Sequence, residues 1–365
     1  MSDRKRIGIL TSGGDCSGLN SIIRAAFIRT KGLGYELFGF KHGLRGLASK
    51  NPEYVVLDDK NCDESMLSTA GSLICSDTVW MSSTIESGKT IDDIKKMIYK
   101  GYEDLSLSGL ICVGGDGSLC LINELLIGNE ELKIVVVPKT IDNDVNNTDF
   151  SIGFYTALEI VVEAIENVRS TAKSHERVMV VEVMGRDAGF IAMYAGIASG
   201  ADIILVPEFE YDIEKVKQKV MHCFKNGKNY CIVVVSESVE AKDFKHDEEF
   251  VNGVMKYSHL TYKGIGQHLV SLIKETGLES RCITLGHTQR GGRTSINDRL
   301  LGTLFGIEAV NLIDRGDCGK LLIFSGNRLK SINVVDAMRD VNKFLTIDDE
   351  CVKAAKALGV YVGEV

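Results

Sequence analysis

The loop Val113-Gly114-Gly115-Asp116-Gly117-Ser118 follows the apolar run 110–113, and the loop Pro138-Lys139-Thr140-Ile141-Asp142-Asn143-Asp144 follows the apolar run 134–137. Each run predicts a buried strand, and open α/β sheets bind their ligands in loops at the carboxyl ends of strands. Glycines in such loops let the backbone approach a phosphate, aspartates hold Mg²⁺, and one carboxylate remains as a base. The two loops together therefore predict phosphoryl transfer to a hydroxyl group.

Length and composition bound the class of protein. The chain has 365 residues, which is long for one small core and favours two domains or two lobes of one α/β unit. Its net charge of −8 offers no basic surface to a nucleic acid or an anionic membrane, so we expect neither as a partner. No apolar run reaches the roughly 18 residues of a membrane span. The charged residues at the start lead directly into a strand, with no signal-peptide pattern.

Ten cysteines are scattered along the chain without a C-x-x-C pair. This spacing does not favour a disulfide framework or a zinc site. Several of the cysteines lie in apolar surroundings and resemble small core residues. We therefore expect reduced, structural cysteines and a cytoplasmic location.

Apolar runs recur through the chain and alternate with helical patterns. The clearest helix follows Gly153, where apolar residues from Leu158 to Val168 repeat at helical spacing. The runs are continuous rather than alternating, as in strands buried on both faces, so we expect mainly parallel sheets with helices on both faces. The charged segment 239–259 is expected to be a surface excursion. The predicted strands are 7–10, 110–113, 134–137, 178–183, 203–206, 232–235 and 283–285.

A third loop, 11–20, contains Gly13-Gly14-Asp15 before a helix predicted from about Ser21. Glycines beside a helix N-terminus cradle an anion with backbone N–H groups. The loop is neither a Walker A motif nor a clean G-x-G-x-x-G motif, and a simple tight turn is an open alternative.

The sequence of the loop 113–118 indicates a phosphate and metal site more specifically than the first loop does. Asp116 is a candidate Mg²⁺ ligand, and Ser118 is a candidate cap of the following helix. The structural alternative is a glycine turn with an N-cap aspartate. In the loop 138–144, Asp142 or Asp144 is positioned to accept a hydroxyl proton, against the alternative of an Asx-turn with solvated carboxylates.

Two further strands end in arginine-bearing loops. Met184-Gly185-Arg186-Asp187 follows the strand 178–183, and Gly286-His287-Thr288-Gln289-Arg290-Gly291-Gly292 follows the strand 283–285. An arginine at a strand end can reach a transferring phosphoryl group or a sugar phosphate. Each arginine alone is also compatible with an ordinary surface charge.

With these five loops in this order, the chain closely resembles the phosphofructokinase family, whose members phosphorylate fructose 6-phosphate at its 1-hydroxyl group. The resemblance extends from about Arg6 to about Leu358. It implies a two-lobed α/β enzyme with its active site in the cleft between the lobes. We expect a nucleotide and Mg²⁺ lobe at 1–150 plus about 289–340. The sugar-phosphate lobe is expected at 151–288 plus about 341–365.

The resemblance also implies a role for each matching residue. Asp142 is the base, Arg186 stabilises the migrating phosphoryl group, and Asp116 holds Mg²⁺. Thr140 and Gly13 assist catalysis. The residues implied for the nucleotide are Gly13, Gly14, Gly115, Asp116, Gly117, Ser118 and Lys139. Those implied for the sugar phosphate are Thr140, Asp142, Asp144, Arg177, Met184, Gly185, Arg186, Glu237, Arg281, His287 and Arg290. Arg177 and Arg281 match arginines donated across a subunit interface, which implies a homo-oligomer, a tetramer or a dimer, with shared active sites.

Two positions of the family pattern bear on the phosphoryl donor. A glycine after Gly-Gly-Asp accompanies ATP, because a side chain there collides with the nucleotide. An aspartate there, with a lysine before Thr-Ile-Asp, accompanies pyrophosphate. This chain combines Gly117 with Lys139. On the steric argument we expect ATP, with pyrophosphate as the alternative.

The segment 70–78 matches a family stretch that usually ends in an arginine bridging both substrates. Thr78 occupies that position here. Loss of a phosphate-bridging charge costs transition-state stabilisation, and Lys139 is one hypothetical replacement. A regulatory subunit that only binds sugar phosphate is therefore a rival, although Asp116, Asp142 and Arg186 are all retained. An oxidoreductase would need a dinucleotide fingerprint that the first loop lacks. Another Gly-Gly-Asp-Gly kinase would not account for the loops at 184–187 and 286–292.

Overall fold

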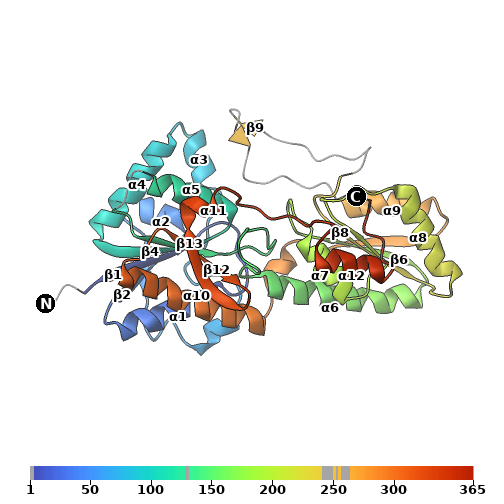
Figure 1. Ribbon diagram of the computed structural model, residues 1–365, viewed down its shortest axis with the longest axis horizontal. Helices are drawn as coiled ribbons and strands as arrows, with labels where there is room; N and C mark the ends of the chain where they lie inside the picture. Colours follow the sequence, from blue (N-terminus) through green and yellow to red (C-terminus); the bar gives the residue numbers. More distant parts are fainter. Residues whose placement is uncertain (1–3, 128–130, 241–249, 252–253, 256–263, 365) are drawn as a thin grey trace.

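The computed structural model places two β-sheets side by side along the long axis of the molecule (Figure 1). It describes residues 4–127, 131–240, 250–251, 254–255 and 264–364. Most of the predicted surface excursion at 239–259 lies outside these residues. In the described part of the chain, no helix is long and apolar enough to cross a membrane. All ten cysteines are free thiols.

The first sheet has seven strands in the order β13-β12-β5-β4-β1-β2-β3. Its inner pairs are parallel, whereas β3 and β13 pair antiparallel with their neighbours at the two edges. The strand bounds are Arg6–Thr11 (β1), Glu36–Phe40 (β2), Tyr54–Val56 (β3), Leu107–Gly114 (β4), Ile134–Pro138 (β5), Lys320–Ser325 (β12) and Arg328–Asn333 (β13).

Helices cover both faces of this sheet because its central strands are apolar on both sides. In β4, Ile111 and Val113 face one core, and Leu110 and Cys112 face the other. The first face is covered by α1 (Leu19–Gly32) and α10 (Ile296–Arg315). The second face is covered mainly by α2 (Leu44–Ala48), α4 (Ile91–Asp104), α5 (Asp116–Leu126) and α11 (Val334–Ala337), with α3 (Trp80–Glu86) beside α4.

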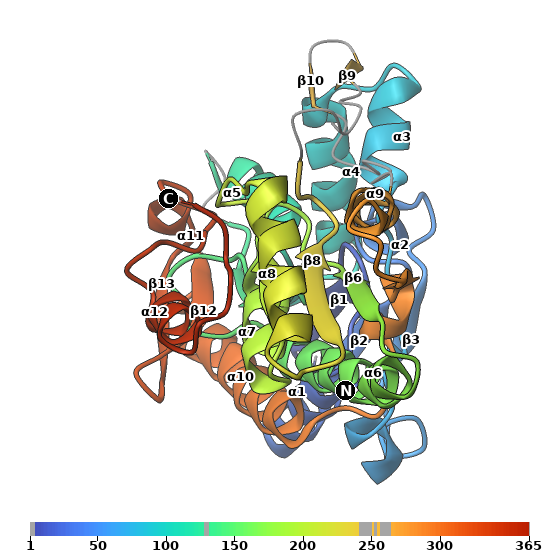
Figure 2. The same ribbon diagram turned by 90° about the vertical axis from the view of Figure 1, so that its right-hand side faces the viewer.

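The second sheet has four parallel strands in the order β11-β6-β8-β7. They are Ser280–Thr284 (β11), Val178–Val183 (β6), Cys231–Ser236 (β8) and Ile203–Leu205 (β7). One face packs against α6 (Phe154–Ser174) and α7 (Phe190–Ala198), and the other packs against α8 (Ile213–Lys225) and α9 (Ile265–Lys274) (Figure 2). The helix α12 (Glu350–Ala357) packs on α7, and the short strands β9 (Phe250–Val251) and β10 (Val254–Met255) pair with each other.

The structure confirms the expected α/β class, the mainly parallel sheets and all seven predicted strands. It also confirms the helix predicted after Gly153, which is α6. A core shared by both sheets continues along α6, since Ile111 of the first sheet and Val181 of the second belong to the same cluster as Val161 of α6. The residue boundaries that we expect for the two lobes stay a prediction.

Asp298 ties the N-terminus of α6 to the start of α10. Its fully buried carboxylate accepts hydrogen bonds from the Gly153 N–H (2.9 Å), the Thr156 N–H (2.8 Å), the Thr156 hydroxyl (2.5 Å) and the Ser295 hydroxyl (3.1 Å). A carboxylate at a helix N-terminus satisfies N–H groups that have no partner within the helix.

Asp298→Ala is therefore expected to lower the free energy of unfolding by about 3 kcal/mol, because it leaves several buried donors without an acceptor. Urea denaturation followed by circular dichroism measures this loss. The matched control is Asp314→Ala on the same helix, where an exposed carboxylate accepts one hydrogen bond from Tyr35, and about 0.5 kcal/mol or less is expected. Equal losses in the two variants would contradict this role of Asp298.

Candidate active site

A cavity of about 1080 Å³ lies where the carboxyl ends of the two sheets face each other. Its walls include the loops that follow β1, β4 and β5 of the first sheet, and β6, β8 and β11 of the second, together with part of α2 and residues of the segment 72–81. This is the cleft between the lobes in which we expect the active site, and its position follows the rule for open α/β sheets.

Most of the sequence-predicted site residues line this cavity. They come from all five motif loops and from the residue that follows β8: Gly13, Gly14, Gly115, Asp116, Gly117, Ser118, Lys139, Thr140, Asp142, Met184, Arg186, Glu237, His287 and Arg290. Asp144 is buried two residues beyond Asp142, and Gly185 lies between two lining residues.

Arg177 and Arg281 lie apart from the cavity. Arg281 is the second residue of β11, and Arg177 immediately precedes β6. Both therefore lie at the amino ends of their strands, whereas the cavity lies at the carboxyl ends. Each forms an ion pair with Glu279, at 3.7 Å for Arg177 and 2.7 Å for Arg281. The role of these two arginines in a partner subunit stays a prediction.

The glycines of the loop 113–118 differ in what they make room for. A Cβ on Gly114 would lie 2.4 Å from the Cβ of Ser118, so packing within the loop requires glycine there. A Cβ on Gly117 would meet no atom within 4 Å, and its backbone is not left-handed. The protein itself therefore imposes no glycine at 117, and the open space faces the cavity.

The expectation that Ser118 caps α5 is wrong. The helix begins at Asp116, and Gly115 is its N-cap residue with no side-chain cap. Ser118 therefore lies inside the first turn, where its hydroxyl is too far along the helix to act as the cap.

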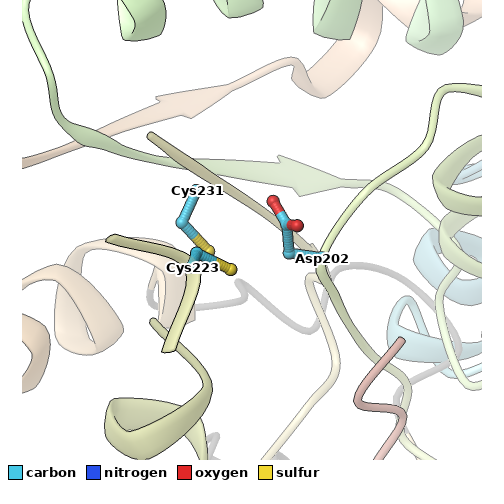
Figure 3. Close-up of side chains that lie close together, drawn as sticks. All are labelled: Asp202, Cys223 and Cys231. Carbon is cyan, nitrogen blue, oxygen red and sulfur yellow. The ribbon is translucent and has the colours of Figure 1, made fainter. Parts of the chain in front are cut away.

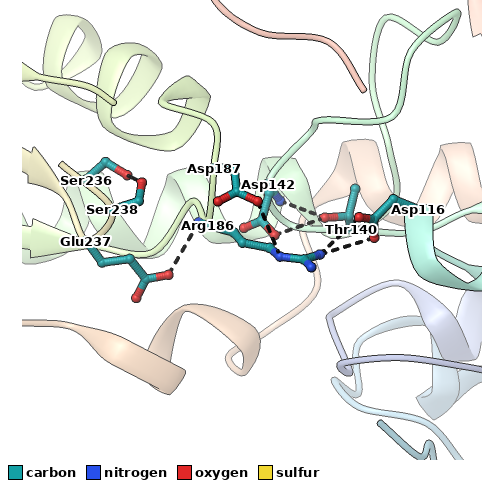
Figure 4. Close-up of polar contacts among 8 residues, drawn as sticks. All are labelled: Asp116, Thr140, Asp142, Arg186, Asp187, Ser236, Glu237 and Ser238. Carbon is teal, nitrogen blue, oxygen red and sulfur yellow. Dashed lines mark hydrogen bonds and ion pairs between the residues drawn. The ribbon is translucent and has the colours of Figure 1, made fainter. Parts of the chain in front are cut away.

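Arg186 joins the two halves of the cavity (Figure 4). Its guanidinium donates to both carboxylate oxygens of Asp116, at 3.1 and 3.2 Å, and its backbone N–H donates to Glu237 at 3.3 Å. Its backbone is left-handed, with φ of 50°, which is uncommon for a residue other than glycine and occurs often at functional sites. The arginine and the candidate metal ligand thus face each other across the cleft.

Asp142 is buried beside Thr140. The Thr140 hydroxyl lies 3.3 Å from one Asp142 carboxylate oxygen and accepts the Asp142 N–H at 3.1 Å. The other carboxylate oxygen is buried without a hydrogen-bond partner, as is one oxygen of Asp144. Burial raises the pKa of Asp142, while the charges of Arg290 and Arg186 act in the opposite direction.

Two neighbouring carboxyl groups share this environment. Burial, and then the charge of Asp142, raise the pKa of Asp144 to about 7. Burial and the charge of Asp142 likewise raise the pKa of Glu237 to about 7. A cluster of carboxyl groups with raised pKa values in a cleft is typical of a functional site. Asp116 lines the cavity and offers carboxylate oxygens, which are the ligands that Mg²⁺ prefers.

Lys139 and Arg290 both hold the first glycine loop. The Lys139 ammonium donates to the Gly14 carbonyl at 2.5 Å, and Arg290 donates to the Asp15 carbonyl at 2.9 Å. Lys139 is only 3% exposed, and burial lowers its pKa. The Lys139 ammonium is therefore directed at the loop after β1.

Two basic residues near the site were not predicted from the sequence. Arg45 of α2 lines the cavity, and Lys343 braces the loop that carries the aspartates. Lys343 donates to the carbonyls of Thr148 (2.7 Å) and Asp149 (3.0 Å), and its own N–H donates to the Asp144 carbonyl. Both residues lie far along the chain from the motifs, in segments without a recognisable pattern, so no local signal identifies them.

A separate cluster of Asp202, Cys223 and Cys231 lies beside β8, with its ligand atoms within 4.8 Å of one another (Figure 3). The Asp202 carboxylate already accepts hydrogen bonds from the Lys228 ammonium (2.5 Å) and the Ile232 N–H (2.9 Å). Because a lysine already neutralises the aspartate, we assign this cluster a packing role.

Asp144→Asn is expected to flatten the pH dependence of stability. The pKa of Asp144 is about 7 when folded, against an ordinary value of 3.8. Between these values the unfolded chain binds fewer protons than the folded one. The contribution of protonated Asp144 is therefore complete below the lower value and is lost as the pH rises through about 7.

Urea denaturation at about pH 5 and about pH 8 tests this expectation. The free energy of unfolding should fall more from the lower to the higher pH in the wild type than in Asp144→Asn. Asp314→Asn, at an exposed position, should follow the wild type. If the wild type and Asp144→Asn show the same pH dependence, Asp144 does not titrate in this range.

Fold and cavity together define an α/β protein of the class that binds its substrates between two lobes. The phosphofructokinase family model matches residues 6–313. The chain is 39% identical over 367 residues to ATP-dependent 6-phosphofructokinase 1 of Nostoc sp., covering 100% of both proteins. It is 37% identical to the pyrophosphate–fructose 6-phosphate 1-phosphotransferase of Dictyoglomus thermophilum, covering 91% of this chain and 92% of that one.

Among solved structures, phosphofructokinase from Saccharomyces cerevisiae superposes with a TM-score of 0.75 at 28% identity, covering 92% of this chain and 45% of that chain. This chain thus spans less than half of the yeast chain but the full length of the Nostoc relative. The protein belongs to the phosphofructokinase family, as the resemblance of its five loops predicts.

Proposed function

We propose that this protein is an ATP-dependent 6-phosphofructokinase. It transfers the γ-phosphoryl group of ATP to the 1-hydroxyl group of fructose 6-phosphate and produces fructose 1,6-bisphosphate, a step of glycolysis. Several relatives that align over the full chain at 36 to 40% identity carry the name ATP-dependent 6-phosphofructokinase.

The observation that carries the choice of ATP is the space at Gly117. Neither packing nor backbone conformation requires glycine there, because a Cβ would meet no atom within 4 Å and the φ angle is not left-handed. Because the protein's own packing and backbone do not require this glycine, we infer that it leaves room for a ligand. A nucleoside triphosphate needs more room than pyrophosphate. Gly13, Gly14, Gly115 and Ser118 complete the cradle for its phosphates.

Pyrophosphate is the second candidate donor. Lys139 and the Dictyoglomus thermophilum relative both favour it. Against it, the Lys139 ammonium is directed at the Gly14 carbonyl, 2.5 Å away, and the residue is only 3% exposed. In this position Lys139 supports the first glycine loop, which serves an ATP site as well as a pyrophosphate site.

Mg²⁺ fits a carboxylate such as that of Asp116, which lines the cavity. We assign Asp116 as its principal ligand. When bound, the ion offsets negative charge on the donor phosphates.

Asp142 acts as the base. The Asp142 side chain lines the cavity, and the Thr140 hydroxyl orients one of its carboxylate oxygens. Burial raises its pKa toward the operating pH, which improves a general base, and Arg290 and Arg186 oppose protonation. The proton passes to Asp142 as the sugar oxygen attacks the γ-phosphorus in line.

Arg186 stabilises the charge on the migrating phosphoryl group. Without substrate its guanidinium pairs with Asp116 at 3.1 Å, so the same arginine is close to the site where the phosphates bind. An arginine that exchanges a carboxylate for a phosphoryl oxygen contributes most in the transition state, where charge spreads over the equatorial oxygens.

The sugar phosphate occupies the half of the cavity formed by the second sheet. Glu237, Met184 and Gly185 contact the sugar, and His287 and Arg290 bind its 6-phosphate. Arg177 and Arg281, which lie away from the cavity of their own chain, reach the 6-phosphate of a partner subunit in a cytoplasmic homo-oligomer.

The test is incubation of the protein with fructose 6-phosphate, Mg²⁺ and ATP, followed by ³¹P NMR of the product. The expected product carries a second phosphate on C1 and forms together with ADP. Phosphorylation at another carbon would contradict the proposal. The absence of any product with the wild-type protein would contradict it as well.

A further inference from the structure

Four basic residues line the cavity: Arg45, Lys139, Arg186 and Arg290. Three of them have defined roles within the loops, because Lys139 donates to Gly14, Arg290 donates to Asp15, and Arg186 donates to Asp116. Arg45 belongs to none of the motif loops. It comes from α2, a short helix on the second face of the first sheet, which α4 and α5 also cover.

The position of Arg45 is fixed by the packing of α2. A Cβ on Gly46 would lie 2.1 Å from the Lys41 carbonyl oxygen, and one on Gly101 of α4 would lie 2.1 Å from the Leu47 carbonyl oxygen. The backbone that follows Arg45, at Gly46 and Leu47, therefore packs directly against neighbouring backbone. Such close packing holds the helix in place and directs the Arg45 side chain toward the cavity.

The guanidinium of Arg45 lies beside the loop that contains Thr78. Its Nη1 atom is 3.4 Å from the Asp77 carboxylate, and the Arg45 side chain is 43% exposed. Asp77 is itself held in place, since its carboxylate accepts the N–H groups of Val79 and Trp80 and its carbonyl accepts the Gly13 N–H at 3.1 Å. One chain of contacts thus connects Arg45 to the first glycine loop.

We propose that Arg45 binds the polyphosphate of the phosphoryl donor and supplies the positive charge that Thr78 does not. The inference rests on the proposed function and assigns one further residue to its donor site. Guanidinium groups recognise phosphates through charge-assisted hydrogen bonds, often in pairs. Asp15, Asp77 and Asp116, which all follow strands or segments of the first sheet's half of the chain, also line the cavity, so a polyanionic donor needs additional positive charge there.

The test compares Arg45→Gln, Thr78→Arg and the double variant with the wild type. Arg45→Gln is expected to raise KM for ATP about tenfold or more and to change KM for fructose 6-phosphate by less than about twofold. In the Arg45→Gln background, Thr78→Arg should restore most of the lost affinity, because it returns an arginine to the same end of the cavity. Binding of Mg-ADP, measured by calorimetry, should weaken in parallel.

Arg6→Gln is the matched control. Arg6 has a similar exposure of 39% and a surface ion pair of 3.8 Å with Glu36, but it lies at the opposite end of β1. Its kinetics should equal those of the wild type. Melting temperatures confirm that each variant folds, and Arg45→Lys provides a second variant that keeps the charge.

An Arg45→Gln variant with an unchanged KM for ATP overturns the inference, as does an equal rise of both KM values. If Thr78→Arg does not lower KM for ATP in the Arg45→Gln background, the claim that Arg45 supplies the charge missing at Thr78 is overturned. These results are distinct from failure of the proposed function, which would appear as an inactive wild-type protein.

Discussion

Asp142→Asn is expected to lower kcat by about a thousandfold and to leave KM for fructose 6-phosphate within about twofold of the wild type. The amide is nearly isosteric with the carboxylate, so it keeps the shape of the loop and its contact with Thr140. It cannot accept the hydroxyl proton, and this function is required only in the transition state. An interaction made only in the transition state affects kcat rather than binding.

Steady-state kinetics with both substrates varied measure this effect. Asp104→Asn is the control, because its exposed carboxylate on α4 pairs with Lys100 and lies outside the cavity lining. It should match the wild type. A large rise in KM with an unchanged kcat in Asp142→Asn would show that Asp142 binds the sugar rather than acting as the base.

Gly117→Asp is expected to lower kcat/KM for ATP by about a hundredfold or more. The new side chain meets no protein atom within 4 Å of its Cβ, so the fold should tolerate it. It occupies the space that we assign to the nucleotide and adds a negative charge beside the phosphates. Both effects act against ATP and neither acts on fructose 6-phosphate.

Gly32→Asp is the matched control for this substitution. Gly32 ends α1, also meets no atom within 4 Å of a Cβ, and is absent from the cavity lining. Its ATP kinetics should be unchanged. Gly117→Ala provides an intermediate case and should lose less activity than Gly117→Asp. Full ATP activity in Gly117→Asp would remove the steric argument for the donor.

The central strands were predictable because burial on both faces leaves a continuous apolar run, as in β5, whose five residues are all buried. Strand β2 was not predicted because Gly39 interrupts its apolar residues. The structure explains that glycine, since a Cβ there would lie 2.6 Å from Ile74. The edge strand β13 was missed because its residues are largely exposed and polar.

The site was predictable where the chemistry lies in one loop, as in 113–118 and 138–144. It was not predictable where tertiary structure brings distant residues together. Arg186 meets Asp116 across 70 positions of sequence, and Arg45 and Lys343 reach the site from separate segments. The incorrect assignment of Ser118 as a cap has a local cause, because α5 begins three residues earlier than that role requires.

The most direct test of the account is fructose 1,6-bisphosphate formation from fructose 6-phosphate and Mg²⁺, with ATP and pyrophosphate supplied in parallel as donors. The account predicts turnover with ATP and little or none with pyrophosphate, because the space at Gly117 accommodates the nucleotide while Lys139 supports the loop. Efficient turnover with pyrophosphate and none with ATP would contradict it and would make Lys139 the residue that decides the donor.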